Sequence, residues 1–419
     1  MTGAAGSAGR AGRPEDVVLD DLAAPRFDPP VAAILASMAA AGEGLVLEPG
    51  PLMEAAVAET GLDDFGDPSF VERLDVLCTA LRTEAGLSPA GVAGQFATLS
   101  GLLRNRLLIE DVVRRHPEVL AQRIDRPIVI CGLPRTGTTH LHNLMSADPA
   151  LRSLPYWESL EPVVAPGQPD LRRERAEQSV AFINAAMPYF KRMHEMTADH
   201  VHEEIQLLAI DFSTMLFETV APMPTWRDYY LSHDQRPSYA YLARVLKVLQ
   251  WARGGTRWVL KSPQHLEQFP ALSATFPDAT FVVTHRDPVA VTASMATMIA
   301  YGGRMSRQRT DPVSIGRYWA ERLEMMLRRC VDDRGVLPDA QSIDVRFDEF
   351  MADDIAMVSK IYGLAGQPFT PSVRAAMAAF MEAHPRGRHG GVRYDLAALG
   401  LDRDERLAAL AFYSARFGV

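Results

Sequence analysis

One stretch limits the possible folds of this chain more than any other: RPIVICGLPRTGTTHLHNLM, residues 126–145. It joins a short apolar run to a glycine-rich turn and then to apolar residues at helical spacing. Gly132 and Gly137 have the G-x-x-x-x-G spacing of a phosphate-binding loop, which connects a strand to a helix in α/β folds. The lysine that should follow the second glycine is replaced by Thr138, with Thr139 next to it. The stretch therefore predicts an anion-binding loop that works without its usual lysine.

The loop retains the features that attract an anion. Backbone N–H groups of a glycine turn at a helix N-terminus bind an anion whatever the side chains are. A Mg²⁺-dependent nucleotide hydrolase would also need an aspartate directly after a second apolar strand, but TFVVTHRDP continues with His285 and Arg286. We therefore expect the loop to hold a terminal anionic group without a metal, the alternative being an incidental glycine turn. The residues expected to contact this group are Arg135, Thr136, Gly137, Thr138 and Thr139.

A second series of strands and helices follows further along the chain. RWVLKSP predicts a short strand that ends at Lys261, HLEQFPALSATF predicts a helix, and TFVVT predicts another strand. Pro288 then suits the first turn of a further helix. Strands that alternate with helices indicate a parallel sheet covered on both faces. We therefore predict a P-loop-like α/β fold, with a parallel sheet sandwiched by helices and helical N- and C-terminal flanks.

The same patterns divide the chain into four expected regions. A flexible tail at 1–15 precedes a helical N-terminal region at 16–120. The α/β core is expected at 121–370, with a helical insertion at about 175–250 that shapes the acceptor site. A helical and glycine-rich C-terminal segment is expected at 371–419.

Composition argues against several classes of function. The net charge of −9 disfavours nucleic-acid binding, which needs a basic surface. No apolar run approaches the ~18 residues of a membrane span, and the N-terminus lacks the hydrophobic core of a signal peptide. Cys78, Cys131 and Cys330 have no metal-binding or redox spacing, which is typical of a protein of the reducing cytoplasm.

Arg286 and Ser294 form a second candidate binding element. Arg286 follows a predicted strand, and Ser294 falls in the second turn of the helix that begins at Pro288. Ligands of α/β folds bind at the carboxyl ends of parallel strands, where an arginine and a hydroxyl could share a second phosphate. Taken alone, the pair is as well explained by a salt bridge and by a serine bonded to its own helix.

Together with the loop, these residues resemble the sulfotransferase family, particularly its bacterial members. LPRTGTTHL is similar to the family's 5′-phosphosulfate loop, and Arg286 with Ser294 is similar to its 3′-phosphate pair. WVLKSPQHLEQFPALSATFPDATFVVTHRDP and SIDVRFDEFMADDIAMVSKIYGLAG also resemble the family, so the resemblance covers about residues 125–370. Two departures stand out: Arg135 takes the place of a lysine found in many members, and Phe347 that of a tyrosine found in some.

The resemblance implies a donor and a reaction. The donor is 3′-phosphoadenosine 5′-phosphosulfate, whose sulfuryl group passes to a hydroxyl or amine of an acceptor by metal-independent in-line displacement. A terminal sulfate is a monoanion that needs no partner Mg²⁺, so backbone amides, threonine hydroxyls and Arg135 would suffice. Arg388, in RGRHGGVR, resembles part of a glycine-rich basic segment that closes over the donor's 3′-phosphate in this family; a solvated loop is the alternative.

In-line transfer needs a cation at the departing oxygen, a base for the acceptor, and alignment of the two substrates. Lys261 matches the family's catalytic lysine and ends a predicted strand. It is also one of only four lysines among 39 arginines, so a lysine here is less readily explained as a generic surface cation. We expect Lys261 to stabilise the departing oxygen.

Three residues are candidates for the base. His265 lies four residues after Lys261 and resembles a lysine–histidine pairing of cytosolic members, in which the two are only two residues apart. Glu203 lies in DHVHEEIQLLAIDF, and Glu158 in PYWES, a region where some members have a glutamate base. If DHVHEEIQLLAIDF is helical, one face carries His200, Glu203, Glu204, Leu207 and Leu208. Glu203 and His265 rank equally, ahead of Glu158, and each acid could instead form an ordinary salt bridge.

The remaining expectations concern other ligands. Metal binding by His200 and His202 is disfavoured because the segment is not H-E-x-x-H, and no metal is expected. MPYF, FETVAPMPTWRDYY and SYAYL carry side chains that line apolar pockets, although core packing explains most of them equally well. We therefore predict a small hydrophobic alcohol or phenol as acceptor. The alternatives are a small-molecule kinase, disfavoured by Thr138 in the lysine position, and a non-catalytic nucleotide-binding protein, disfavoured by Lys261.

Overall fold

A computed structural model describes residues 14–419, so the predicted tail at 1–15 lies almost entirely outside the described residues. Its centre is a four-stranded sheet in the order β2-β1-β3-β4, and every neighbouring pair is parallel. The strands are β1 (Ile128–Cys131), β2 (Val259–Ser262), β3 (Thr280–His285) and β4 (Ser342–Arg346). The first three are strands that the sequence predicted, and the α/β class with a parallel sheet is confirmed.

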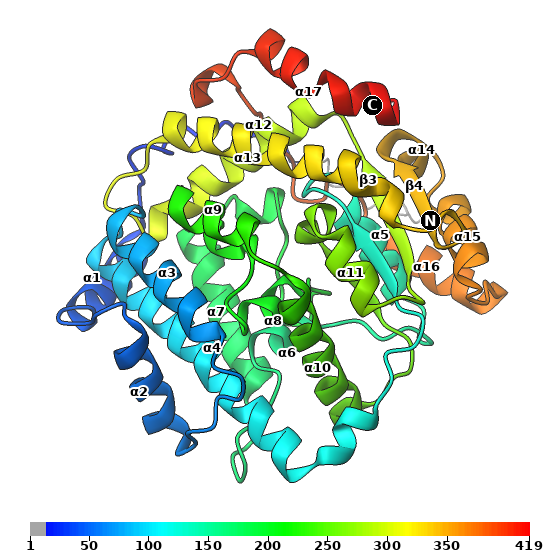
Figure 1. The fold of residues 1–419 in the computed structure, drawn as a ribbon. Helices are drawn as coiled ribbons and strands as arrows, with labels where there is room; N and C mark the ends of the chain where they lie inside the picture. The colour runs from blue at the N-terminus through cyan, green and yellow to red at the C-terminus, as the bar shows by residue number, and fades with distance from the viewer. Residues whose placement is uncertain (1–13) are drawn as a thin grey trace, which may run out of the picture.

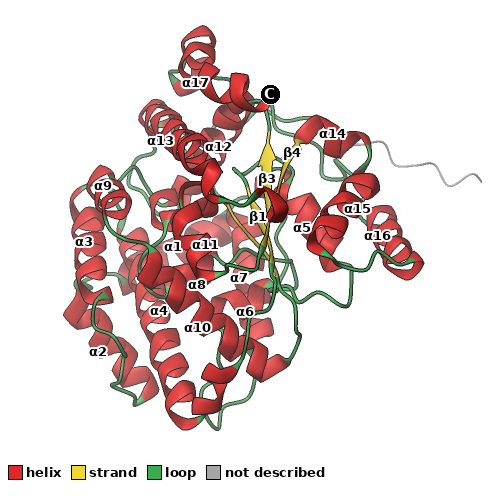
Figure 2. Cartoon of the chain, turned by 45° about the vertical axis from the view of Figure 1, so that its right-hand side comes forward, coloured by secondary structure: helices red, strands yellow, loops and turns green. Residues whose placement is uncertain are grey.

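Helices cover both faces of this sheet (Figure 2). Because side chains alternate along a strand, Ile128 and Ile130 of β1 point to one face, where they pack in a cluster with residues of α5, α15 and α16. Val129 and Cys131 point to the other face and join the larger core formed with the remaining helices. The sheet is therefore buried on both sides, which explains why its central strands read as continuous apolar runs.

The helices are grouped along the chain as Figure 1 shows. The N-terminal group is α1 (Pro29–Ala41), α2 (Pro49–Thr60), α3 (Phe70–Thr83) and α4 (Pro89–Arg115). The helices between β1 and β2 are α5 (Thr138–Ser146), α6 (Tyr156–Leu160), α7 (Arg172–Ala186), α8 (Ile205–Ala209), α9 (Pro224–Ser232) and α10 (Arg236–Arg253). Those after β2 are α11 (Phe269–Thr275), α12 (Pro288–Gly302), α13 (Pro312–Asp333), α14 (Phe347–Ala352), α15 (Asp354–Ala365), α16 (Pro371–Ala383) and α17 (Arg403–Phe417). No helix within residues 14–419 has the length and apolar character needed to span a membrane.

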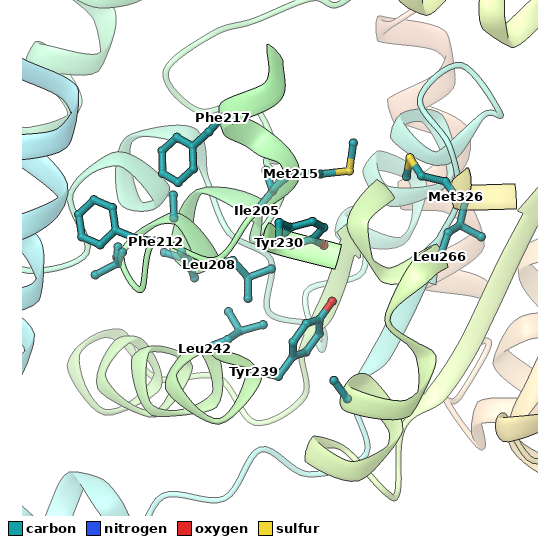
Figure 3. Packing of buried hydrophobic residues seen from close by; sticks show 14 of the residues in the cluster. Ile205, Leu208, Phe212, Met215, Phe217, Tyr230, Tyr239, Leu242, Leu266 and Met326 are labelled. Atoms are coloured by element: carbon teal, nitrogen blue, oxygen red, sulfur yellow. The ribbon is translucent and has the colours of Figure 1, made fainter. Parts of the chain in front are cut away.

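Two of the aromatic segments assigned to the acceptor pocket, FETVAPMPTWRDYY and SYAYL, contribute to the core instead. Figure 3 shows Phe217, Tyr230 and Tyr239 packed with aliphatic side chains, and all three are almost completely buried. Trp226 is fully buried in the same cluster. Core packing therefore explains these residues, and they do not support a hydrophobic acceptor.

A buried ion-pair network links this core to the segment after β2. Arg322 of α13 contacts Glu218 at 3.0 Å and Glu267 at 2.6 Å, and none of the three side chains is exposed. Glu267 ends the short 3₁₀ helix Pro263–Glu267, which directly follows β2. Since removing one partner of a buried ion pair leaves an uncompensated charge, the network holds this end of β2 in place.

Candidate active site

A pocket of about 660 Å³ opens at the carboxyl end of the sheet, between the loop after β1 and two other segments. Its volume is in the range of small-ligand sites. One wall comes from 191–201, before α8, and the rim comes from 384–390, after α16. Of the predicted donor-binding residues, those that line it are Arg135, Gly137, Thr138, Thr139, Arg286 and Arg388. The position follows the general rule for parallel α/β sheets.

The loop is held in a tight conformation. Gly137 has φ 87°, and a Cβ there would lie 3.2 Å from Phe347, so glycine is required at the start of α5. At Gly132 a Cβ would come within 1.9 Å of the Thr284 hydroxyl. Arg135 is one of three non-glycine residues with positive φ in the described chain, at 74°. Such strain is typical of functional loops.

Thr136 differs from its neighbours in the loop. Its hydroxyl donates to the Leu133 carbonyl at 2.6 Å and lies 2.7 Å from the Thr284 hydroxyl. Its amide also donates to the Leu133 carbonyl, at 3.3 Å. Thr136 therefore shapes the loop from inside, while Thr138 and Thr139 face the pocket.

Arg135 and Arg286 bring two positive charges to one side of the pocket. Arg286 donates to the Arg135 carbonyl at 2.6 Å, and its guanidinium stacks 4.1 Å from the centre of the Phe347 ring. Within residues 14–419 neither arginine makes a salt bridge with a carboxylate. Burial and the neighbouring Arg135 lower the pKa of Arg286. Two partly buried guanidinium groups that no carboxylate contacts would attract an anion. Phe347, which departs from the family's tyrosine, thus positions Arg286.

Ser294 lies in the second turn of α12, the helix that begins after Arg286 and Asp287. Its hydroxyl is buried and has no hydrogen-bond partner in the described residues. A buried hydroxyl without a partner is costly, so a ligand oxygen at this position would satisfy it. The serine does not bond to its own helix, which was the alternative explanation.

Lys261 and Glu203 form an ion pair beside the loop. Lys261 is 1% exposed at the end of β2, and its Nζ contacts Glu203 Oε1. Glu203 lines a small cavity under the loop together with Thr138 and Thr139. The amide of Lys261 donates to Glu204 Oε2 at 2.8 Å, and Glu204 in turn accepts from His265 Nε2 at 2.5 Å.

Glu204 is a supporting residue that sequence reasoning grouped with Glu203 but did not assign. Burial alone would raise the pKa of Glu204, but the hydrogen bond and charge of His265 outweigh it and lower the pKa overall. The adjacent acids therefore have different roles: Glu204 accepts a hydrogen bond from the backbone amide of Lys261, and Glu203 forms an ion pair with its side chain.

The predicted helix through His200, Glu203 and Leu208 is wrong at its start. The chain is irregular up to Glu204, and α8 covers only Ile205–Ala209. The reason is that Val201 bridges to Pro155 and the His202 amide donates to the Leu154 carbonyl, contacts that an amphipathic pattern cannot reveal.

The other two base candidates are buried and line neither the pocket nor the small cavity beside Glu203. His265 is fully buried, with Nδ1 2.8 Å from the Tyr239 hydroxyl and Nε2 on Glu204. Glu158 is 2% exposed and pairs with Arg152 at 3.0 Å. A base must reach the acceptor proton, so we propose neither His265 nor Glu158 for that role.

Arg388 belongs to the glycine-rich segment after α16 and lies on the pocket rim. In the structure it contacts Glu195 at 2.5 Å, across the pocket mouth from its own segment. The His389 ring lies 3.0 Å from the same carboxylate. The segment therefore reaches over the pocket toward the wall formed by 191–201.

Three histidines gather on that wall: His194, His200 and His202. Burial, and then the charge of nearby groups including Lys261, lowers the pKa of His194 and His202 well below its usual value, and that of His200 to about 4. All three rings are therefore neutral at physiological pH. Sequence reasoning considered the last two together but missed His194, which lies on a separate turn and carries no motif.

The comparisons with known proteins agree with this geometry. A family model described as "Sulfotransferase family" matches residues 127–371, more than half of the chain. The chain belongs to the sulfotransferase family. Sulfotransferase STF1 from Mycobacterium tuberculosis H37Rv is 31% identical, with a TM-score of 0.76, over 86% of this chain and 97% of that one. Sulfotransferase STF9 from Mycobacterium avium is 26% identical, with a TM-score of 0.81, over 90% of this chain and 98% of that one. No curated protein sequence matches the chain significantly.

The family match covers most of the candidate site residues. The matched residues include the loop, Lys261 and the Arg286–Ser294 pair, whereas Arg388 lies beyond them. The resemblance noted from sequence is confirmed, and family membership supports sulfuryl-transfer activity. The chain covers almost the whole length of both mycobacterial structures.

Proposed function

We propose that the protein transfers the sulfuryl group of 3′-phosphoadenosine 5′-phosphosulfate to a hydroxyl or amine of a small acceptor. The observation that carries the proposal is the combination of two guanidinium groups without carboxylate partners, Arg135 and Arg286, with the unsatisfied hydroxyl of Ser294. These groups fit a ligand with more than one anionic group. We also propose a cytoplasmic location, which three buried free cysteines support.

The donor would be held at two places. The amides at the start of α5, with Thr138 and Thr139, would take the 5′-phosphosulfate, because a helix N-terminus and its free N–H groups attract anions. Arg286 and Ser294 would take the 3′-phosphate. Arg388 would approach from the rim once it exchanges Glu195 for a phosphate oxygen.

The chemical step would use the Lys261–Glu203 pair. The acceptor oxygen attacks sulfur as its proton passes to the Glu203 carboxylate, and the bond between sulfur and the bridging phosphate oxygen breaks. Lys261 Nζ would donate to that departing oxygen. In the structure Nζ contacts Glu203, so donor binding would turn the amine toward the donor and free the carboxylate for the acceptor.

Donor binding can be tested without turnover. Adenosine 3′,5′-bisphosphate should raise the melting temperature in the absence of Mg²⁺, because a ligand of the native state stabilises it, and ATP should do so much less. Arg286→Ala should weaken bisphosphate binding by about tenfold or more, since it removes a charge-assisted contact. Ser294→Ala should weaken it without lowering the melting temperature of the free protein, because the hydroxyl has no partner to lose.

A surface arginine provides the control for this experiment. The exposed Arg26 side chain pairs with the exposed carboxylate of Asp20, so Arg26→Ala should bind the bisphosphate as the parent does. Equal stabilisation by ATP and the bisphosphate, unchanged in Arg286→Ala, would reject the donor assignment. Stabilisation by ATP only when Mg²⁺ is present would instead favour a kinase.

The acceptor class is proposed as a small alcohol or phenol. The pocket is bordered by the rim segment and has the size of a small-molecule site, part of which the donor would fill. Transfer from labelled donor should therefore be faster to small alcohols and phenols than to a glycosaminoglycan or a tyrosyl peptide at matched concentration. Product masses measure this directly. Transfer confined to either polymer would contradict the assignment.

A further inference from the structure

The cluster of His194, His200 and His202 offers three imidazole nitrogens at one point of the pocket wall. One ring nitrogen from each lies within 4.8 Å of the other two, and no other group of at least three such ligands was found in residues 14–419. None of the three side chains makes a hydrogen bond to another described residue. Nδ1 of His202 is buried without any partner. The nitrogens are therefore free to take a ligand.

The spacing fits a metal ion after a small adjustment. Three atoms no more than 4.8 Å apart all lie within about 2.8 Å of a common centre, whereas Zn–N bonds are about 2.0–2.1 Å long. Each nitrogen would have to move inward by about 0.7 Å, which side-chain rotation can supply. His194 and His200 lie on short irregular segments rather than inside a helix.

The cluster is also accessible. His194 and His200 line the pocket, and His202 lies behind them against Tyr156, with ring centroids 4.8 Å apart. An ion held by three protein nitrogens beside a pocket would keep a coordination position open to a ligand from that pocket. Three protein ligands with one open position are typical of sites where zinc binds water or a substrate.

We propose that His194, His200 and His202 form a binding site for a divalent transition-metal ion such as Zn²⁺, separate from the groups that hold the donor. Imidazole suits zinc, copper, nickel and cobalt and does not suit Mg²⁺ or Ca²⁺, which take oxygen ligands. Charged groups around the cluster act on a bound cation in both directions. Lys261 and Arg135 would repel it, and the negative charges of Glu203 and Glu195 would partly offset this repulsion. The site does not depend on the proposed donor chemistry.

The test uses the full chain, freed of any polyhistidine tag and of metal by a chelator that is then removed. Calorimetric titration with ZnCl₂ should show one ion per chain. Co²⁺ should give the visible absorption of a nitrogen-ligated ion of low coordination number, and MgCl₂ should give neither signal. His194→Ala and His200→Ala should each weaken Zn²⁺ binding by at least about tenfold.

His384→Ala is the matched control, because His384 also lines the pocket but stands outside the cluster. It should bind Zn²⁺ as the parent does. Circular dichroism confirms that each variant is folded, and His200→Gln replaces any alanine variant that is not. Absence of Zn²⁺ and Co²⁺ binding by the parent, or equal affinity in the parent and both cluster variants, would overturn the proposal, and neither result would bear on bisphosphate binding.

Discussion

Lys261→Ala is expected to lower turnover by about 100-fold or more, the usual effect of removing one donor to charge that develops in a transition state. Binding of adenosine 3′,5′-bisphosphate should change far less, because the loop amides, Arg286 and Ser294 would still hold it. Single-turnover kinetics and a binding titration on the same variant separate the two effects.

Two further variants make this result specific. Lys261 is buried, so Lys261→Met keeps most of the side-chain volume while removing the amine, and it should lose turnover as fully as the alanine variant. Lys191→Ala removes a lysine that lines the pocket and should leave turnover close to that of the parent. Normal turnover at saturation with a collapsed donor affinity would make Lys261 a binding residue only.

The parts of the fold that sequence predicted best are those with strong local signals. Ile128–Cys131 is a continuous apolar run before a glycine turn, and the structure has β1 at those residues. Pro288 is the first residue of α12, a position that suits the fixed φ of proline. Asp287 caps the helix by accepting a hydrogen bond from the Val289 amide. In both cases the deciding interactions lie within a few residues of each other.

What the sequence left open depends on contacts between residues distant in sequence. For Glu158 both a base and a salt bridge were possible, and the structure pairs it with Arg152, whose guanidinium stacks on Trp258. The sequence position of His265, four residues after Lys261, suggested that the two act together. In the structure both ring nitrogens of His265 are bonded to residues of other segments, Glu204 and Tyr239. Periodicity along one segment contains no information about such partners.

The site itself was predicted in part for the same reason. Arg135 and Arg286 come after β1 and β3, and Lys261 lies near the carboxyl end of β2. Parallel strands bring these ends to one edge of the sheet, so the three residues converge. His194 and Glu195 belong to an irregular segment whose path depends on tertiary contacts such as that of the Arg135 side chain with the Met193 carbonyl. Their place in the pocket therefore required the structure.

Glu203→Gln is expected to lower turnover by about 10²- to 10⁴-fold, the range for loss of a general base, and to flatten the acidic limb of the rate–pH profile. Glutamine keeps the shape of the side chain but cannot accept the acceptor's proton. The limb arises because protonation of the base at low pH stops transfer, so it should disappear only in a variant that lacks the base.

The matched control for this prediction is Glu195→Gln, which alters a carboxylate that lines the pocket and pairs with Arg388 and His389. It should keep the acidic limb even if donor affinity changes. A Glu203→Gln enzyme with an intact limb would exclude Glu203 as the base. Because Glu203 and Lys261 are in direct contact, the double variant Glu203→Gln/Lys261→Met should lose less than the product of the two single losses, as expected for residues that act as one unit.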